Sequence, residues 1–242
     1  MKLPFIKMQG LGNDYVYIDC FSPETAAIIA KTDLPALARR VSDRHFGIGS
    51  DGMVLILPSA TADARMRIFN ADGSEAEMCG NAIRCVGKYL YESGLCRMTK
   101  QEIETIAGIR TLMLQVKDGT VEQVTVNMGS TLGNPHRVFI TDQPVERIAI
   151  HEIKGTNAEW VNVLNEDEIA MRVWERGSGE TLACGTGACA AAAAAMDRGL
   201  TRNEVTVHLR GGALWVRRDA KGTIYMTGPA TEVFRGEWRM EN

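Results

Sequence analysis

Two cysteines of this chain, Cys79 and Cys184, stand in nearly identical polar turns. Each is followed by Gly and a small polar residue, and then by a run with helical spacing of apolar residues. The shared positions lie nine before, four before and one after the cysteine: Asn70, Glu75 and Gly80 in the first turn, Glu175, Glu180 and Gly185 in the second. Two copies of one reactive turn predict two cysteines that face each other.

The start of a helix is an unusual environment for a thiol. The first N–H groups of a helix lack partners and carry the positive end of its dipole, which favours a thiolate. A single cysteine of this kind suggests a nucleophile with a histidine partner. Two suggest that one thiolate removes a proton from carbon while the opposite thiol returns one to the other face. Such a pair inverts a stereocentre without redox change or a covalent intermediate.

The residues around both cysteines suit an amino-acid substrate. Residues 80–81 (Gly80, Asn81) and 185–186 (Gly185, Thr186) leave backbone N–H groups free for a carboxylate, where charge grows as an α-proton leaves. Glu175 could hold an ammonium group, and Arg176 could clamp a second carboxylate as a bidentate fork. Four amides could bind both ends of an amino acid: Asn13, Asn70, Asn134 and Asn157.

Plainer interpretations stand beside these. Asn and Gly often occur in turns for backbone conformation alone. We expect Glu75 and Glu180 to cap helices or face solvent, and His136, after a Pro turn, can be a surface histidine. The other four cysteines are expected to be small buried hydrophobes: Cys20, Cys85, Cys96 and Cys189.

Composition narrows the class of protein. At 242 residues with 45% apolar and 24% charged residues, the chain is typical of a globular protein of one large or two small domains. A net charge of −3 gives no electrostatic basis for binding nucleic acid or a membrane surface. Without a long apolar run or a secretory leader, a cytoplasmic location is expected. No Cys-x-x-Cys spacing occurs, so free thiols and no metal site are predicted.

The hydrophobic pattern predicts an α+β protein with few helices. Helices are expected within 24–41, split by Pro35, from Cys79 to Gly94, and around 188–195, ending near Gly199. Strands are expected at 3–9, 15–19, 53–57, 64–69, 102–107, 111–117, 121–128, 137–141, 158–164, 168–174, 204–209, 213–217 and 223–227. Gly47–Gly52 has the letters of a dinucleotide fingerprint, but its strand follows instead of preceding it, so that function is rejected.

The cysteine turn recurs at an offset of 105 residues, which predicts two homologous lobes. A second repeat, Leu-Gly-Asn at 11–13 and 132–134, supports the duplication. The N-terminal lobe is expected to comprise 1–129 plus 230–242, with the last segment returning as an extra strand. The C-terminal lobe comprises 130–229.

Taken together, these motifs resemble the diaminopimelate epimerase family of cofactor-independent racemases. The similar segments run in order along the chain: 10–14, 44–52, 67–74, 78–81, 133–136, 156–157, 175–181, 183–187 and 226–230. The resemblance implies two pseudo-symmetric lobes, each a curved, mostly antiparallel sheet wrapped around a central helix. It implies interconversion of LL- and meso-diaminopimelate, for lysine and peptidoglycan synthesis, without pyridoxal phosphate or metal. The family's usual assembly is a homodimer.

The resemblance also assigns roles. Cys79 and Cys184 match the family's base and acid. Gly80, Asn81, Gly185 and Thr186 match its backbone cradle for the reacting carboxylate. Matches for the distal amino-acid end are Asn70, Asn134, Asn157 and Arg176, with Asn13 as a further pocket residue. His136 and Glu175 match a pair set beside the thiols.

The chain departs from the family pattern in one region. Only 130–132 separate Gly129 from the Gly-Asn-Pro-His turn, where the family has a long segment, and 141–156 is short as well. We expect a strand or two of the C-terminal lobe to be missing and the chemistry to survive, because every motif residue is present.

Two alternatives remain: a racemase of another amino acid such as histidine, and a non-catalytic amino-acid-binding protein. Arg176 favours diaminopimelate, since a substrate without a second carboxylate leaves it unpaired. The presence of both cysteines disfavours a mere binding protein.

Overall fold

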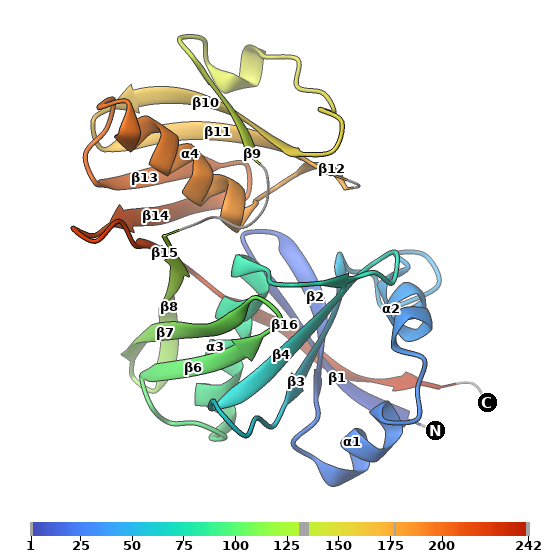
Figure 1. Cartoon of the computed structure of the whole chain (residues 1–242). Helices are drawn as coiled ribbons and strands as arrows, with labels where there is room; N and C mark the ends of the chain where they lie inside the picture. The colour runs from blue at the N-terminus through green and yellow to red at the C-terminus, as the bar shows by residue number, and fades with distance from the viewer. Residues whose placement is uncertain (1, 131–135, 177, 241–242) are drawn as a thin grey trace. The chain divides into compact units, whose positions relative to one another are not determined.

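A computed structural model describes residues 2–130, 136–176 and 178–240. The chain divides into two compact units, each built from strands and one central helix (Figure 1). Unit 1 comprises 1–10, 14–124 and 230–242; unit 2 comprises 11–13 and 125–229. The predicted α+β class and the central helix of each half are confirmed. No helix in the described ranges is long and apolar enough to cross a membrane.

The elements of unit 1 follow the predicted strands closely. Its strands are β1 (Lys2–Gly10), β2 (Asn13–Asp19), β3 (Gly52–Leu57), β4 (Ala64–Asn70), β5 (Glu75–Ala76), β6 (Lys100–Thr105), β7 (Gly108–Lys117), the first part of β8 (Thr120–Gly129) and β16 (Thr231–Arg239). Its helices are α1 (Pro23–Ile29), α2 (Leu34–Ser42) and α3 (Gly80–Ser93). The strand order is β16-β1-β2-β3-β4-β6-β7-β8, and β5 pairs with β4.

Local sequence signals fix the helix ends of unit 1. Pro35 lies in the first turn of α2, whose Asp33 cap accepts a hydrogen bond from the backbone of Ala36 at 3.1 Å. Gly94 ends α3 with a φ of 83°, a left-handed conformation that glycine adopts without strain. Both boundaries agree with the predictions.

The sheet of unit 1 has helices on both faces. Met53 and Leu55 of β3 pack in a buried cluster with Leu37 and Val41 of α2. The intervening Val54 is equally buried, and alternation along a strand directs it to the opposite face. α3 contacts β1 and β7. Its buried side and the cluster under α2 therefore form two apolar layers around one sheet.

The C-terminal strand returns to unit 1 as predicted. β16 pairs antiparallel with β1, with Phe5 opposite Gly236. A Cβ at Gly236 would lie 2.7 Å from the ring of Phe5, so glycine is required by this close approach. The chain end thereby completes the edge of the sheet.

Unit 2 repeats the plan around an alanine-rich helix. Its elements are the end of β8, β9 (His136–Thr141), a 3-10 turn η1 (Val145–Arg147), β10 (Asn157–Asn165), β11 (Glu168–Glu175), β12 (Gly179–Thr181), α4 (Gly185–Asp197), β13 (Glu204–Leu209), β14 (Gly212–Arg218) and β15 (Ile224–Gly228). The strand order is β15-β14-β13-β11-β10-β9, with β12 paired to β11. α4 contacts β9, β10, β11, β13, β14 and β15 (Figure 1). Most strand pairs of both units are antiparallel.

Two details of the chain's division differ from the sequence-based boundaries. β8 continues past Val124 and hydrogen-bonds through Thr125 to Thr227 at 2.7 Å, so its end belongs to unit 2. Leu11 also belongs to unit 2, because its backbone lies against Gly211. The expected loss of a strand or two in the C-terminal lobe stays a prediction, since 131–135 lie outside the described residues.

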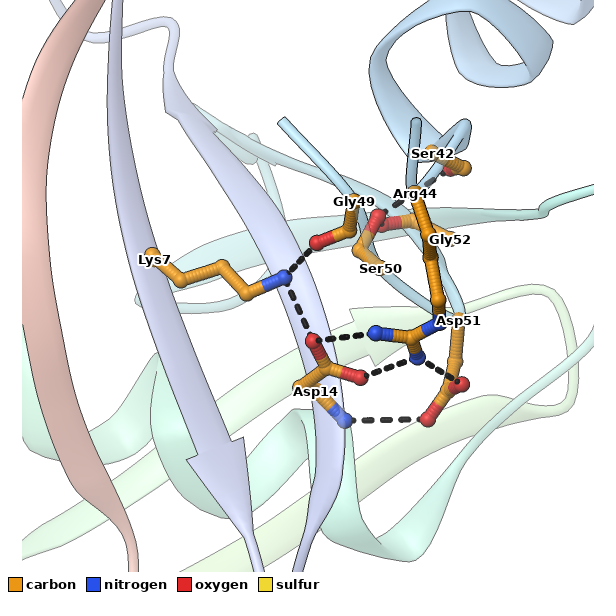
Figure 2. A network of polar contacts seen from close by, with 8 residues as sticks. All are labelled: Lys7, Asp14, Ser42, Arg44, Gly49, Ser50, Asp51 and Gly52. Carbon is orange, nitrogen blue, oxygen red and sulfur yellow. Dashed lines mark hydrogen bonds and ion pairs between the residues drawn. The ribbon is translucent and has the colours of Figure 1, made fainter. Parts of the chain in front are cut away.

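A partly buried ion network ties the β1–β2 turn to the loop after α2 (Figure 2). Lys7 Nζ lies 2.5 Å from Asp14 Oδ2 and donates to the carbonyl of Gly49. Arg44 Nη2 donates to Asp14 Oδ1 at 2.8 Å and to Asp51 Oδ1 at 2.9 Å. The backbone N–H of Asp14 donates to Asp51 Oδ2, and the backbone N–H of Asp51 donates to the carbonyl of Asp14. The network holds two motifs of the sequence, 10–14 and 44–52, against each other.

The charge of Asp14 is favoured by this network. Burial alone would raise its pKa, but the hydrogen bonds and charges of Arg44 and Lys7 outweigh burial and lower the pKa below its ordinary value. A lowered folded-state pKa contributes stability that is present above the unfolded pKa. That stability is lost as pH falls through the folded-state pKa.

We expect Asp14→Asn to lower the free energy of unfolding by about 3 kcal/mol at neutral pH, because Lys7 would stay buried without its carboxylate. Urea titration measures this, and the deficit should shrink as the pH is lowered. Glu237→Gln, which breaks the exposed 2.6 Å pair with Lys2, is the matched control and should change stability by less than about 0.5 kcal/mol. Equal effects of both variants would contradict a stabilising network.

Candidate active site

Cys79 caps the N-terminus of α3. Its backbone is extended, with φ −137° and ψ 120°, and α3 begins at the next residue. The sulfur makes no capping hydrogen bond and is half-buried. The hydroxyl of Tyr15, a buried residue of β2, lies 4.0 Å from the sulfur and donates to it. The leading N–H groups of α3 therefore lie beside a thiol that is itself supported by a hydroxyl.

Cys184 caps α4 in the same way but in a more enclosed setting. Its backbone is extended, and its sulfur accepts a hydrogen bond from the backbone of Gly187 at 3.4 Å. The hydroxyl of Thr186 is 3.5 Å from the sulfur. Only 5% of Cys184 is exposed. Both predicted helix starts are thus present, each directly after its cysteine.

At Cys184 the shift towards thiolate that is expected of a helix start is outweighed by burial. Burial raises the pKa of its thiol well above the ordinary value, and the charge of Glu175 adds to that shift. Hydrogen bonds from Thr186 and Gly187 act in the opposite direction and are outweighed; the charge of Glu159 raises the pKa further. Cys184 is consequently a neutral thiol near pH 7 and suited to donating a proton.

Each thiol turn is held by a bidentate arginine–glutamate pair. Arg67 donates to Glu75 at 2.7 and 3.0 Å, and Arg172 donates to Glu180 at 2.8 and 3.0 Å. These hydrogen bonds lower the pKa of each glutamate. Neither glutamate caps a helix, which corrects that expectation; Glu75 is exposed, as the alternative expectation had it, and Glu180 is partly buried. The sequence held the signal, an arginine eight residues before each glutamate, and it was missed.

In unit 1 the predicted residues gather around the end of β4 and the start of α3. Asn70 ends β4 and donates through its amide to the hydroxyl of Ser74 at 2.9 Å. Gly80 and Asn81 form the first turn of α3 and are buried. These residues and Cys79 belong to one strand–hairpin–helix segment.

In unit 2 the predicted residues cluster where β10, β11 and α4 meet. Asn157 begins β10, and its Oδ1 accepts a hydrogen bond from the backbone of Arg176 at 2.9 Å. Glu175 accepts from the hydroxyl of Thr181 at 2.5 Å. The guanidinium of Arg176 is exposed and makes no bond with any described residue, so it is available to a ligand. Gly185 and Thr186 form the first turn of α4.

The remaining predicted residues have different outcomes. Asn13 begins β2, is half-buried and is grouped with unit 2. Asn134 lies outside the described residues. His136 begins β9, and its imidazole is bonded to Glu159 at 2.7 Å, whereas Glu175 is bonded elsewhere. Its side chain is only 5% exposed, so the surface-histidine interpretation is wrong.

The predicted facing of the two thiols concerns both units together and stays a prediction.

Three of the other four cysteines are buried as expected. Burial raises the pKa of Cys20 to about 12 and that of Cys85 to about 11, and Cys189 is fully buried. Cys96 is half-exposed, which corrects its expected burial. All six thiols are free. Within the described ranges, no group of three or more His, Cys, Asp or Glu residues is placed to hold a metal ion.

Comparison with known proteins gives consistent results. A family model described as diaminopimelate epimerase matches residues 5–133 and again 130–233. The diaminopimelate epimerases of Pelotomaculum thermopropionicum and Acetivibrio thermocellus are each 44% identical over 278 aligned positions. The alignments cover 97% and 96% of this chain and 98% and 97% of those proteins. Because the alignments are longer than this chain, the relatives contain residues that it lacks.

A solved structure shares the fold at low sequence identity. The phenazine biosynthesis protein of the PhzF family from Enterococcus faecalis superposes with a TM-score of 0.76 at 13% identity, covering 99% of this chain and 100% of that one. At this identity the likeness concerns the fold alone. It confirms the predicted fold of two lobes with central helices.

We expect Tyr15→Phe to slow alkylation of Cys79 at neutral pH by about threefold, because losing one weak hydrogen bond to the thiolate raises its pKa. Iodoacetamide labelling followed by site-resolved mass spectrometry measures the rate. The control is Tyr89→Phe, whose hydroxyl donates to Asp19 at 2.8 Å instead of to a thiol. An unchanged Cys79 rate in Tyr15→Phe would remove the hydroxyl from the site.

Proposed function

We propose that this chain, which belongs to the diaminopimelate epimerase family, converts LL-diaminopimelate to meso-diaminopimelate in the synthesis of lysine and peptidoglycan precursors. It is an isomerase that works without pyridoxal phosphate. The observation that carries the proposal is the duplicated turn, which places a free thiol at the start of a central helix in both units. The family match supplies the substrate.

The proposed reaction is a two-base proton transfer. The thiolate of one cysteine removes the α-proton, so that a C–H bond breaks and an S–H bond forms. The electron pair moves into the α-carboxylate, and the second thiol then protonates the opposite face of the α-carbon. The second cysteine ends as a thiolate, and the reverse direction exchanges the two roles.

The helix starts would stabilise the charge that develops. The first turns of α3 and α4, at 80–81 and 185–186, present backbone N–H groups of the kind that bind a carboxylate. Because negative charge increases as the proton leaves, these bonds strengthen towards the transition state. Cys184, whose pKa is raised by burial and by Glu175, supports the donor role, which leaves Cys79 as the base.

We assign the distal end of the substrate to polar groups that match the family's motifs. Arg176 has an exposed guanidinium that can bind the second carboxylate in bidentate fashion. Asn157 holds the backbone of Arg176, and Asn70 lies at the end of β4. A small amino acid with two carboxylates would thus be preferred to one with a single carboxylate.

Location and assembly complete the proposal. We place the reaction in the cytoplasm, where thiols stay reduced, because all six cysteines are free. We also propose the homodimer typical of the family, with no nucleic-acid or membrane partner. Sedimentation velocity of the purified chain tests the dimer.

Cys79→Ser and Cys184→Ser should each lower turnover by at least about 1000-fold, since a serine hydroxyl is a far weaker acid than a thiol. The measurement is α-proton exchange in deuterated water on LL- and meso-diaminopimelate and on single amino acids including histidine. Cys85→Ser and Cys189→Ser are the matched controls and should act on stability. Wild-type turnover in either active-site variant would sink the two-thiol mechanism, and exchange restricted to another amino acid would change the substrate.

Arg176→Met should raise the KM for diaminopimelate by about 100-fold, because a bidentate charged contact of about 3 kcal/mol is lost. Initial rates over a range of substrate concentrations measure this. Arg198→Met, at the exposed end of α4, is the control and should leave KM unchanged. An unaltered KM in Arg176→Met would show that the distal carboxylate binds elsewhere.

A further inference from the structure

A buried histidine–glutamate pair lies beside the start of α4. His136 Nδ1 and Glu159 Oε1 are 2.7 Å apart, and the two side chains are 5% and 0% exposed. An ionised carboxylate only accepts hydrogen bonds, so a charged Glu159 receives this bond from Nδ1–H. Glu159 therefore fixes the orientation of the imidazole.

Gly187 brings this pair next to the active-site sulfur. A Cβ placed at Gly187 would lie 2.7 Å from Glu159 Oε1 and 3.3 Å from Cys184 Sγ. The carboxylate and the sulfur are thus separated by no more than the sum of these two distances. The absence of a side chain at 187 allows a charged group to approach the thiol from inside the unit.

Two polar atoms of the pair have no partner. Glu159 Oε2 and His136 Nε2 are both buried, and neither is hydrogen-bonded to any described residue. Each such atom costs about 1–3 kcal/mol of stability, so the arrangement is not explained by folding alone. Buried polar atoms without a hydrogen-bond partner are often found in functional sites.

The other groups packed against Cys184 are few. Glu175 of β11 supplies a second carboxylate, and Thr186 of α4 supplies a hydroxyl. The side chains that β13, β14 and β15 bury are apolar: Val205, Val207, Leu214, Val216, Ile224 and Met226. Glu159, alone of the two carboxylates, is also coupled to an imidazole.

We propose that Glu159 is a positioning residue of the Cys184 half of the site. It holds His136 in place through the hydrogen bond at Nδ1, and its carboxylate lies beside the sulfur, where it opposes ionisation of the Cys184 thiol. That this thiol then protonates the substrate carbon rests on the proposed function. The position of the Glu159 carboxylate beside the sulfur does not depend on that function.

The test is the pH dependence of Cys184 alkylation by iodoacetamide, resolved by mass spectrometry, in the wild type, Glu159→Gln and Glu159→Asp. Gln keeps an acceptor for Nδ1 but removes the charge, so alkylation of Cys184 at pH 8 should become about tenfold faster, the effect of one pH unit. Turnover on diaminopimelate should fall, by about tenfold or more. Asp keeps the charge, so slow alkylation should persist.

Two controls separate this role from structural damage. Glu168→Gln alters an exposed histidine–glutamate pair, with His208, and should change neither rate. Cys189, fully buried five residues along α4, should stay unlabelled wherever the fold is intact. If Glu159→Gln exposes Cys189, Glu159→Asp decides alone: slow Cys184 alkylation supports the proposal.

An unchanged Cys184 rate in folded Glu159→Gln, or fast alkylation in Glu159→Asp, would overturn the proposal. Because alkylation needs no substrate, this result is independent of the proposed activity. If the wild type exchanges no α-proton of diaminopimelate, the proposed activity is refuted. The alkylation comparison would still test the role of Glu159.

Discussion

The structure depends on one constraint: each central helix must begin at its cysteine while most of that helix is buried. A buried helix start leaves N–H groups that need partners, and the chain itself satisfies only some of them. At α4 the sulfur of Cys184 accepts from Gly187, and in both units the hairpin before the helix is clamped by a bidentate arginine–glutamate pair. The N–H groups at the two helix starts are where the proposed substrate carboxylate would bind. Sheet, hairpin and helix are arranged to hold that start in place.

The two thiols lie in similar turns but have different surroundings. Cys79 is half-buried near a tyrosine hydroxyl, whereas Cys184 is enclosed and has carboxylates beside it. Proton transfer in opposite directions needs a base and an acid, so identical environments would serve the reaction poorly. Duplication of the turn supplied the geometry, and divergence of the surrounding strands supplied the electrostatic difference.

Polar networks here position elements, while apolar layers stabilise them. The layers on both sides of the unit 1 sheet consist of buried apolar side chains, whose removal from water favours folding. The Lys7–Asp14–Arg44 network adds a specific docking of one turn on one loop, at a considerable desolvation cost. The network offsets this cost by holding the β1–β2 turn in one conformation.

The sequence by itself determined the α+β class, the duplicated halves, nearly every strand and helix, and the two thiol turns. It could do so because alternation, capping residues, Pro35 and Gly94 act locally. The Arg67–Glu75 and Arg172–Glu180 pairs had a local signal, the repeated spacing of eight residues. The tertiary structure decided that Glu159 meets His136. It also reversed the expected effect on Cys184, because burial and neighbouring carboxylates outweigh a helix dipole. Those partners come from other strands, and local sequence carries little information on what a buried group will face.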